Sequence, residues 1–475
     1  MIRQREEPVP IDLIHQYHDL LGQSGIAAAS QEFLENYQRQ HGLYFGERPL
    51  CSVLRPRFLS HLQYQFLRHR VRLLCMAFAK AQQAALADDA FRAQFGLTPQ
   101  EDELVRLDPG FACAYPTSRL DAFYVSEDEL YFTEFNSETP AGPGYNHALT
   151  ELFFMLPAMR EFQKQFQLYG LATHVGVIHA LLAAYEQWSG SRNKPTICIL
   201  DWAEVPTYSE FRLFEKHFHY YGLDAVIADP REVEYTQHRL YAKGRAIDLI
   251  YKRVLISELL DRGGMEHPVI RAVRAGDVCM INPLRCKILF KKASFAVLTD
   301  EQNSHLFTSE ERAVILAHIP WTRVVEERQT LAPGASKSTR ENSPKSPQVE
   351  TGSKVDLVPY ILANKDQLVL KPNDDYGGKG IVLGWTVDSS AWEAAVQTAL
   401  QTPYIVQERV NLPKEPFPNW IDDKLVVVDR MVDTDPYILH GQYMDGSLCR
   451  ISTADLLNVT AGGGSTVPTF VVEKR

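Results

Sequence analysis

The segment QLVLKPNDDYGGKGIVLGW, residues 367–385, constrains the fold of this 475-residue chain more than any other feature. Two apolar runs flank a polar, glycine-rich stretch, a pattern that predicts two strands joined by a hairpin loop. Glycines let backbone N–H groups approach an anion closely, and a lysine supplies a point charge. We therefore interpret the segment as a flexible flap over phosphate groups, formed by Lys371, Gly377, Gly378, Lys379 and Gly380.

Two common phosphate-binding motifs do not describe this loop. No G-K-[ST] leads from it into a helix, and it does not match GxGxxG. A plain hairpin with a solvated lysine is the alternative interpretation.

A second strand candidate, PYIVQERV, follows the flap. An extended strand carrying Gln407 and Glu408 and followed by Val410 would offer backbone groups to the edge of an adenine ring. Taken alone, the same residues are also consistent with an ordinary edge strand.

A third feature lies upstream, where RLDAFYVSEDELYFTEFN predicts a hairpin with a polar turn at residues 126–129. Because side chains alternate along a strand, Glu134 and Asn136 share one face, and Arg119 shares a face with Asp121. The residues that follow, SETPAGPGYN, are typical of a turn, so a plain turn after an edge strand is the alternative.

The flap and the candidate hinge strand, in this order, resemble the ATP-grasp superfamily. The resemblance implies a second ATP lysine upstream, for which KKASFAVL offers Lys292, with Lys291 as the second choice. In ordinary members the metal-binding E-x-N follows the hinge strand, but no E-x-N occurs after Val410 here. Glu134 and Asn136 supply it upstream instead, so the order resembles the circularly permuted ATP-grasp proteins, of which glutathionylspermidine synthetase is the most similar named example.

The resemblance implies a set of site residues. Asp121, Glu134 and Asn136 are expected to bind Mg²⁺, which takes hard oxygen ligands. Arg119 is expected either to grip the transferred phosphoryl group or simply to pair with Asp121. Towards the end of the chain, the expected catalytic or lid residues are Arg450, Gly462, Gly463 and Gly464.

The sequence divides into four predicted regions within an α/β (α+β) fold. Residues 1–110 read as a helical region, with one long helix over residues 59–86. Residues 111–190 hold the metal-binding hairpin, and residues 286–475 hold the lysines, flap and hinge. Residues 191–285 contain three strand candidates, TICIL, DAVIADP and AIDLIYKRV, and are expected to form a Rossmann-like substrate domain. The polar segment 331–354 predicts a disordered insertion.

The net charge of −10 and the pI of about 5.9 argue against a nucleic-acid or membrane partner. The seven scattered cysteines form no C-x-x-C pair, and the first residues, MIRQREEPVPIDL, lack the apolar core of a signal peptide. We therefore expect a cytoplasmic protein; the sequence does not indicate its oligomeric state.

Together these features predict an ATP- and Mg²⁺-dependent ligase that joins a carboxylate to an amine through an acyl phosphate. The resemblance implies a peptide or amino acid as the acid and a polyamine or amino acid as the amine. Two alternatives stay open, a non-catalytic ATP-binding scaffold or regulatory protein and an ATP-grasp kinase.

Overall fold

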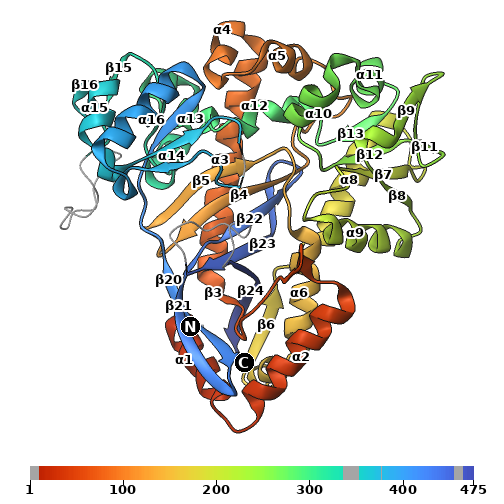
Figure 1. Cartoon of the computed structure of the whole chain (residues 1–475), viewed down its shortest axis with the longest axis vertical. Coiled ribbons are helices and arrows are strands. Elements are labelled where there is room, and N and C mark those ends of the chain that lie inside the picture. Colours follow the sequence, from red (N-terminus) through yellow and green to blue (C-terminus); the bar gives the residue numbers. More distant parts are fainter. Residues whose placement is uncertain (1–9, 335–351, 376, 454–463) are drawn as a thin grey trace, which may run out of the picture.

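A nine-stranded sheet runs through the middle of the computed structural model, which describes residues 10–334, 352–375, 377–453 and 464–475 (Figure 1). Its main path has the order β20-β21-β23-β22-β4-β5, and β24 joins β23 to β3 and β6. The strands come from both halves of the chain: β3 (Arg57–Ser60), β4 (Thr117–Tyr124), β5 (Leu130–Asn136), β6 (Phe166–Gly170), β20 (Lys414–Ile421), β21 (Lys424–Val432), β22 (Asp435–Leu439), β23 (Tyr443–Ser452) and β24 (Ser465–Lys474).

The long helix α3 (His61–Ala87) packs on this sheet and begins as the sequence predicts, within two residues. A capping box fixes its start, because the Gln63 N–H donates to Ser60 Oγ at 3.2 Å and the Ser60 N–H donates to Gln63 Oε1 at 3.0 Å. Its apolar face enters the core through Phe78, whose ring centroid lies 4.6 Å from that of Phe135 on β5.

The remaining helices surround the sheets. Those before the middle of the chain are α1 (Pro10–Leu21), α2 (Ile26–His41), α4 (Asp89–Arg92), α5 (Pro99–Val105), α6 (Pro143–Met155), α7 (Pro157–Phe162), α8 (His174–Ser189) and α9 (Tyr208–Tyr220). Those after it are α10 (Ile256–Gly263), α11 (Pro268–Ala275), α12 (Lys287–Phe290), α13 (Ala293–Thr299), α14 (Ser309–His318), α15 (Leu357–Ala363) and α16 (Ser389–Gln401). None of these helices, over the ranges that the structure describes, is long and apolar enough to cross a membrane.

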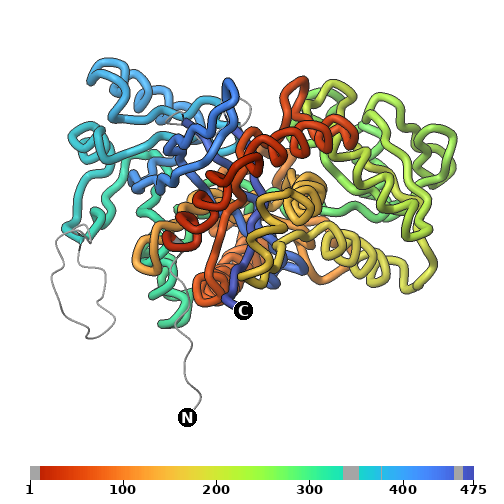
Figure 2. The backbone as a smooth tube through the Cα atoms, turned by 90° about the horizontal axis from the view of Figure 1, so that it is seen from below, coloured from red at the N-terminus to blue at the C-terminus, as the bar shows by residue number. Residues whose placement is uncertain are grey.

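Two smaller units lie on opposite sides of the central sheet. Figure 2 shows the green segment, residues 190–285, on one side and the cyan and light-blue segment, residues 320–410, on the other, with the dark-blue end of the chain between them. Figure 1 shows the same arrangement from a perpendicular direction.

The unit within residues 190–285 contains a parallel sheet of order β13-β12-β7-β8. Its strands are β7 (Thr196–Leu200), β8 (Asp224–Ala228), β12 (Leu249–Lys252) and β13 (Cys279–Ile281). Parallel strands with helices on both faces are buried, which explains the continuous apolar run TICIL.

One strand prediction in this unit is wrong. AIDLIYKRV is not a single strand, because the chain changes partners at Asp248, whose carboxylate accepts the Thr196 N–H at 3.0 Å. The part before Asp248 is β11 (Arg245–Ile247), which belongs to a separate antiparallel sheet, and the part after it is β12. The other members of that antiparallel sheet are β9 (Val233–Thr236) and β10 (Arg239–Ala242).

The unit on the other side holds an antiparallel sheet of order β14-β19-β17-β18. Its strands are β14 (Thr322–Val324), β17 (Leu368–Pro372), β18 (Val382–Leu383) and β19 (Tyr404–Glu408). β17 and β18 form the predicted hairpin, although GIVLGW contributes only two strand residues before a 3-10 turn at Gly384–Thr386.

Two short hairpins complete the strand list. β1 (Tyr44–Phe45) pairs with β2 (Arg48–Pro49), and β15 (Gln329–Leu331) pairs with β16 (Lys354–Asp356). The second hairpin joins the two ends of the predicted insertion, because Leu331 and Lys354, its first and last residues, are strand partners. Residues 335–351 of that insertion lie outside the described residues.

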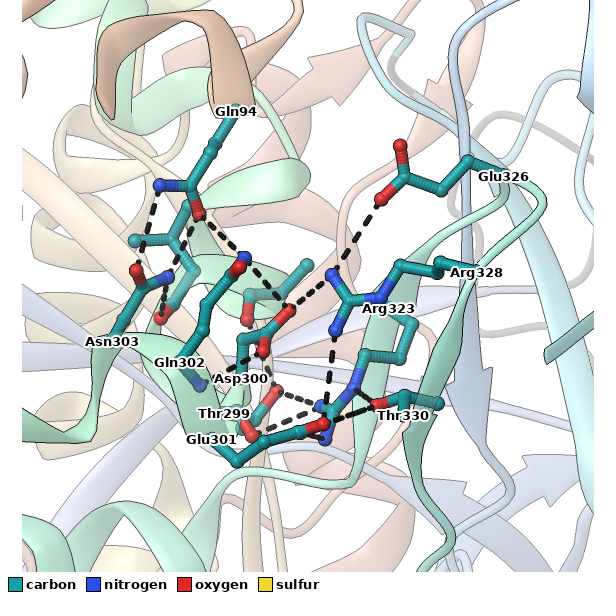
Figure 3. A network of polar contacts seen from close by, with 12 residues as sticks. Gln94, Thr299, Asp300, Glu301, Gln302, Asn303, Arg323, Glu326, Arg328 and Thr330 are labelled. Carbon is teal, nitrogen blue, oxygen red and sulfur yellow. Dashed lines mark hydrogen bonds and ion pairs between the residues drawn. The ribbon is translucent and has the colours of Figure 1, made fainter. Parts of the chain in front are cut away.

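A polar network holds β14 in place, and Figure 3 shows it from close by. Arg323 donates to Thr330 Oγ1 at 2.7 Å and pairs with Glu301 at 2.7 Å, while Arg328 pairs with Asp300 at 2.7 Å. Because Arg323 also donates to the carbonyl oxygens of Thr299 and Thr322, the strand is fixed at its backbone. β14 is the neighbour of β19, which carries the predicted hinge residues.

Candidate active site

The β4–β5 hairpin has a register that places the predicted metal residues opposite each other. Arg119 faces Asn136 and Asp121 faces Glu134, but Ala122 faces Phe132, so Thr133 is an extra residue that forms a β-bulge. Phe132 and Phe135 are three residues apart, yet both enter the core. The bulge makes this possible by shifting the alternation, which leaves Glu134 on the face opposite to the core.

Asp121 is the most heavily contacted of these residues. Arg119 grips it with two hydrogen bonds of 2.7 and 2.9 Å, Arg450 reaches its Oδ2 at 2.7 Å, and Asn136 donates to its Oδ1 at 3.0 Å. Burial opposes ionisation of Asp121, but the charges of Arg119 and Arg450 outweigh burial and lower its pKa to about 2. Of the two roles expected of Arg119, pairing with Asp121 is the contact that this structure contains.

Two further carboxylates, which the sequence analysis missed, belong to the same cluster. Asp433 contacts Arg450 Nε at 2.6 Å, and Asp435 at the start of β22 contacts Arg450 Nη2 at 2.9 Å. Burial raises the pKa of both carboxyl groups, and neighbouring Asp121 adds to the effect. The signal for them was the spacing D-x-D in MVDTDP, which places both on one face of an extended segment.

Lys371 extends from β17 towards the bulge. Its ammonium donates to Gln407 Oε1 at 2.7 Å and to the carbonyl oxygen of Thr133, the bulged residue, at 3.3 Å. Burial lowers the pKa of Lys371 to about 8; the charge of Glu134 offsets part of this, and that of Lys292 reinforces it. The site therefore holds a lysine that is short of negative charge.

The two lysines considered as the upstream ATP residue point in different directions. Lys292 contacts Glu134 Oε1 at 3.1 Å and the carbonyl oxygen of Asp375, so it lies with Lys371. Lys291 instead contacts Glu101 at 2.7 Å and Asp374 at 2.8 Å. The geometry thus favours Lys292 as the candidate.

The predicted hinge residues lie beside Lys371 on β19. The buried Gln407 accepts from Lys371 and donates to Thr322 Oγ1 at 3.0 Å, so its side chain links the two strands that flank β19. The Glu408 N–H donates to the carbonyl oxygen of Trp321 at 2.8 Å, and burial raises the Glu408 pKa. Val410 is the second residue after the end of the strand.

The predicted flap is a loop with left-handed glycines. Gly377, Gly378 and Gly380 have φ values of 67°, 77° and 72°, a region that favours glycine, and Lys379 is exposed. In the second predicted lid, Gly462 and Gly463 lie outside the described residues, and Gly464 directly precedes β24.

The donor atoms in this cluster fit a hard divalent cation. Asp121, Glu134 and Asn136 offer side-chain oxygens of the type that Mg²⁺ takes, and Asp433 and Asp435 add buried carboxylates next to them. Arg450 and Lys292 contact the same carboxylates, so a bound cation would compete with these two side chains.

A second buried group of charges lies behind the site and was also missed. We call it the Glu138 network; it consists of Glu101, Glu138, Lys252, Lys287, Lys291 and Asp374. Glu138 contacts Lys287 at 3.1 Å and Lys252 at 3.4 Å. Its members come from separate parts of the chain, so no local motif could have revealed them.

Two buried side chains of the parallel-sheet unit are tied to the loop after β5. Glu210 accepts the N–H groups of Gly142 and Gly144 at 2.8 and 3.0 Å and pairs with Arg253 at 3.2 Å. Arg253 also donates to the carbonyl oxygen of Pro140 at 2.8 Å.

No protein-family model matches this chain. A curated relative, the putative glutamate–cysteine ligase 2-3 of Frankia alni, is 25% identical over 233 residues. The match covers 46% of this chain but 23% of the relative, so this chain spans less than a quarter of the relative's length.

A solved structure resembles almost the whole chain. The apo form of a glutathione synthetase-like effector from Globodera pallida has a TM-score of 0.52, covering 98% of this chain and 97% of that one at 12% identity. D-alanyl-alanine synthetase A of Vibrio cholerae covers 50% of this chain and 67% of its own, with 11% identity and a TM-score of 0.25, a value too low to compare folds. The molecule therefore shares its mixed α/β fold with this glutathione synthetase-like effector.

Proposed function

We propose that the protein is an ATP-dependent carboxylate–amine ligase that forms an amide bond through an acyl phosphate, similar to glutathionylspermidine synthetase. The observation that carries this proposal is the convergence of two lysines, Lys292 and Lys371, on a cluster of carboxylates around Asp121 and Glu134. The glutathione synthetase-like fold and the partial similarity to a ligase support the same general chemistry.

We further propose that the fold is circularly permuted. β4 and β5 come from the first third of the chain, yet β4 pairs with β22 from its last tenth, with Arg119 facing Tyr437. The carboxylates of the front hairpin and Arg450 of β23 thereby belong to one sheet. This arrangement is what a displaced metal-binding strand would produce.

The distribution of charge suggests how ATP would lie. Lys292 pairs with Glu134, and Glu134 is also the main negative charge acting on Lys371, with Asp121 a weaker one. Two lysines beside one close carboxylate would attract phosphate to this end. Asp121, Asp433 and Asp435 crowd at the other end, which suits a divalent cation. Mg²⁺ bound there would neutralise phosphate charge and align the γ-phosphoryl group.

The reaction follows from these positions. A substrate carboxylate oxygen attacks the γ-phosphorus in line and ADP leaves, while Lys292 and Lys371 stabilise charge on the phosphoryl oxygens. The substrate amine then attacks the acyl carbon, phosphate leaves, and the amine loses a proton. The glycine-rich loop at residues 377–380 would exclude water from the acyl phosphate.

The substrates are proposed by chemical class. We expect a peptide or amino acid as the acid and a polyamine or amino acid as the amine, with residues 191–285 forming the substrate domain. The contacts of Glu210 and Arg253 with residues 140–144 tie this unit to the loop that follows the metal-binding strand.

The test is ADP and phosphate release from purified protein supplied with ATP, Mg²⁺ and a panel of carboxylate and amine pairs. The proposal expects release that requires both substrates and is lost in Glu134→Ala and Lys371→Ala. Lys164→Ala is the control, because Lys164 is exposed and pairs with the partly exposed Glu161 rather than with any of these residues.

Other outcomes identify the alternatives. A stable phosphorylated product without free phosphate would indicate a kinase. Nucleotide binding without turnover of any pair would indicate a scaffold or regulatory protein, and turnover unchanged by both variants would overturn the proposed site.

A further inference from the structure

Three histidines from three helices meet away from the candidate active site. They are His147 of α6, His174 at the start of α8 and His217 of α9. One potential ligand atom from each lies within 4.8 Å of the other two. Since they are far apart in sequence, only the packing of the helices brings them together.

The three rings have few other partners among the described residues. Nδ1 of His217 is buried without a hydrogen-bond partner there. The ring of His174 packs on those of His147 and His217, with centroid distances of 3.5 and 4.3 Å. Buried imidazole nitrogens normally find a partner, so a cluster of rings that contact mainly one another requires an explanation.

We propose that His147, His174 and His217 form a binding site for a divalent transition-metal ion of the Zn²⁺ type, distinct from the Mg²⁺ site expected at Asp121. Imidazole nitrogen is a preferred ligand of zinc, whereas Mg²⁺ takes oxygen ligands.

The distances are compatible with such a site. Nitrogens bound at about 2.0–2.1 Å from a tetrahedral zinc lie roughly 3.4 Å from one another. Closing the separation from 4.8 Å is within reach of side-chain rotation. Burial lowers the pKa of the three rings to about 4, 3 and 4, so they are neutral at pH 7, as ligands must be.

A carboxylate lies beside the cluster in a position to hydrogen-bond one of the rings. Glu151, one turn after His147 on α6, contacts His147 Nε2 at 3.5 Å. Metal-binding histidines usually donate their second ring nitrogen to such a group, which fixes the orientation of the ring. The Glu151 side chain is exposed and that of His147 is partly exposed, so this side of the cluster lies near the surface.

The cluster lies between helices that pack on two different sheets, so a bound metal would link these sheets. α6 packs on β23 and β24 of the central sheet, whereas α9 packs on β8 of the parallel sheet. His217 lies seven residues, or two helical turns, after Glu210, which accepts the N–H groups at the start of α6. A metal would therefore link α6 and α9 at a second place, about 10 Å from the hydrogen bonds that Glu210 accepts.

The experiment measures zinc binding to full-length protein freed of metal by a chelator. Titration calorimetry should give one Zn²⁺ per chain, undisturbed by excess Mg²⁺. The variants His147→Gln and His217→Gln should each weaken binding roughly 100-fold or more, because loss of an outer partner alone costs 10–100-fold.

His219→Gln is the matched control and should bind zinc normally. His219 lies on the same helix, but its ring contacts the carbonyl oxygen of Ala225 rather than the cluster. Because the chain also contains seven cysteines, Co²⁺ should be bound in parallel. The proposal expects visible bands of four-coordinate Co²⁺ without a thiolate charge-transfer band.

Absence of zinc binding in the unaltered protein would overturn the proposal. So would equal affinity in His217→Gln, or a thiolate band with Co²⁺. Since the unaltered protein alone gives a decisive result, a variant that fails to fold does not prevent the test. The result is also independent of ligase activity, so it can fail while the proposed function stands.

Discussion

Two groups of buried lysines lie close together in this molecule and have opposite electrostatic character. In the Glu138 network, burial opposes the charge of Lys287, yet the carboxylates of Glu138 and Asp374 outweigh burial and raise its pKa. In the candidate active site, burial lowers the pKa of Lys371 to about 8 because Glu134 compensates only in part. Lys291 and its sequence neighbour Lys292 divide between the two groups.

The difference separates a structural lysine from one suited to bind a ligand. A lysine whose charge is matched by carboxylates gains nothing from an incoming anion. A buried lysine that lacks a full counter-charge lowers its free energy when a phosphate arrives. Burial alone therefore does not identify an anion site; the balance of charge around the ammonium does.

The largest expected effect is on stability, in the Glu138 network. Lys287→Met should lower the free energy of unfolding by about 3–5 kcal/mol, because it leaves the buried Glu138 and the partly buried Asp374 without their main cation. Urea denaturation measures the change. Adding Glu138→Gln to Lys287→Met should restore part of the loss, and a loss below about 1 kcal/mol in the single variant would contradict this account of the network.

The next effect is on catalysis, in the candidate active site. Lys371→Met should reduce ATP-dependent turnover by about 10²–10³-fold, the cost of removing one donor to a developing charge. Its unfolding free energy should change by less than about 1 kcal/mol, since the variant removes a buried and incompletely balanced charge. A large loss of stability here would mean that the two groups of lysines are alike.

The pH dependence of ATP binding should show the same difference. Below its pKa of about 8, Lys371 is protonated and attracts phosphate; above it, the charge is lost. Affinity should therefore be full near pH 7 and fall up to tenfold for each pH unit above 8, as measured by calorimetry. Lys371→Arg should abolish this decline, and a decline that persists in Lys371→Arg must come from another group.

The smallest effect is expected in the flap. Lys379 is exposed, and an exposed ion pair contributes about 0–1 kcal/mol. Lys379→Ala should thus weaken ATP binding by less than about fivefold. Comparing its affinity with that of Lys371→Met in one titration series tests whether burial of the lysine matters, and equal losses would show that it does not.

The sequence carried enough information to predict the local elements of the candidate site. The β4–β5 hairpin, the β17–β18 hairpin and the strand with Gln407 all form where the alternation of apolar residues and the turn residues indicate. The prediction that Lys292, Lys371 and Glu134 lie together depended on the order of the motifs, since no local pattern encodes a distance across the chain.

What escaped prediction depends on long-range pairing. Glu138 stands in the quoted segment after β5, but its lysine partners lie more than a hundred residues away. Asp433 and Asp435 are recognisable as part of the site only from their contacts with Arg450. The division of AIDLIYKRV at Asp248 likewise depends on which strand each half meets, and this is decided by the tertiary structure rather than by local propensity.

Thr133 is one residue more than the regular alternation of β5 would contain. After it, the odd- and even-numbered residues exchange faces of the strand, so Phe135 points to α3 and Glu134 points away. If β5 alternated regularly through Thr133, Glu134 would point into the hydrophobic core and Phe135 would point towards the lysines. Because the bulge takes up Thr133 as an extra residue, the carboxylate and the aromatic ring each keep the side on which the proposed site needs them. The position of the bulge thus matters to that site as much as the identity of the side chains around it.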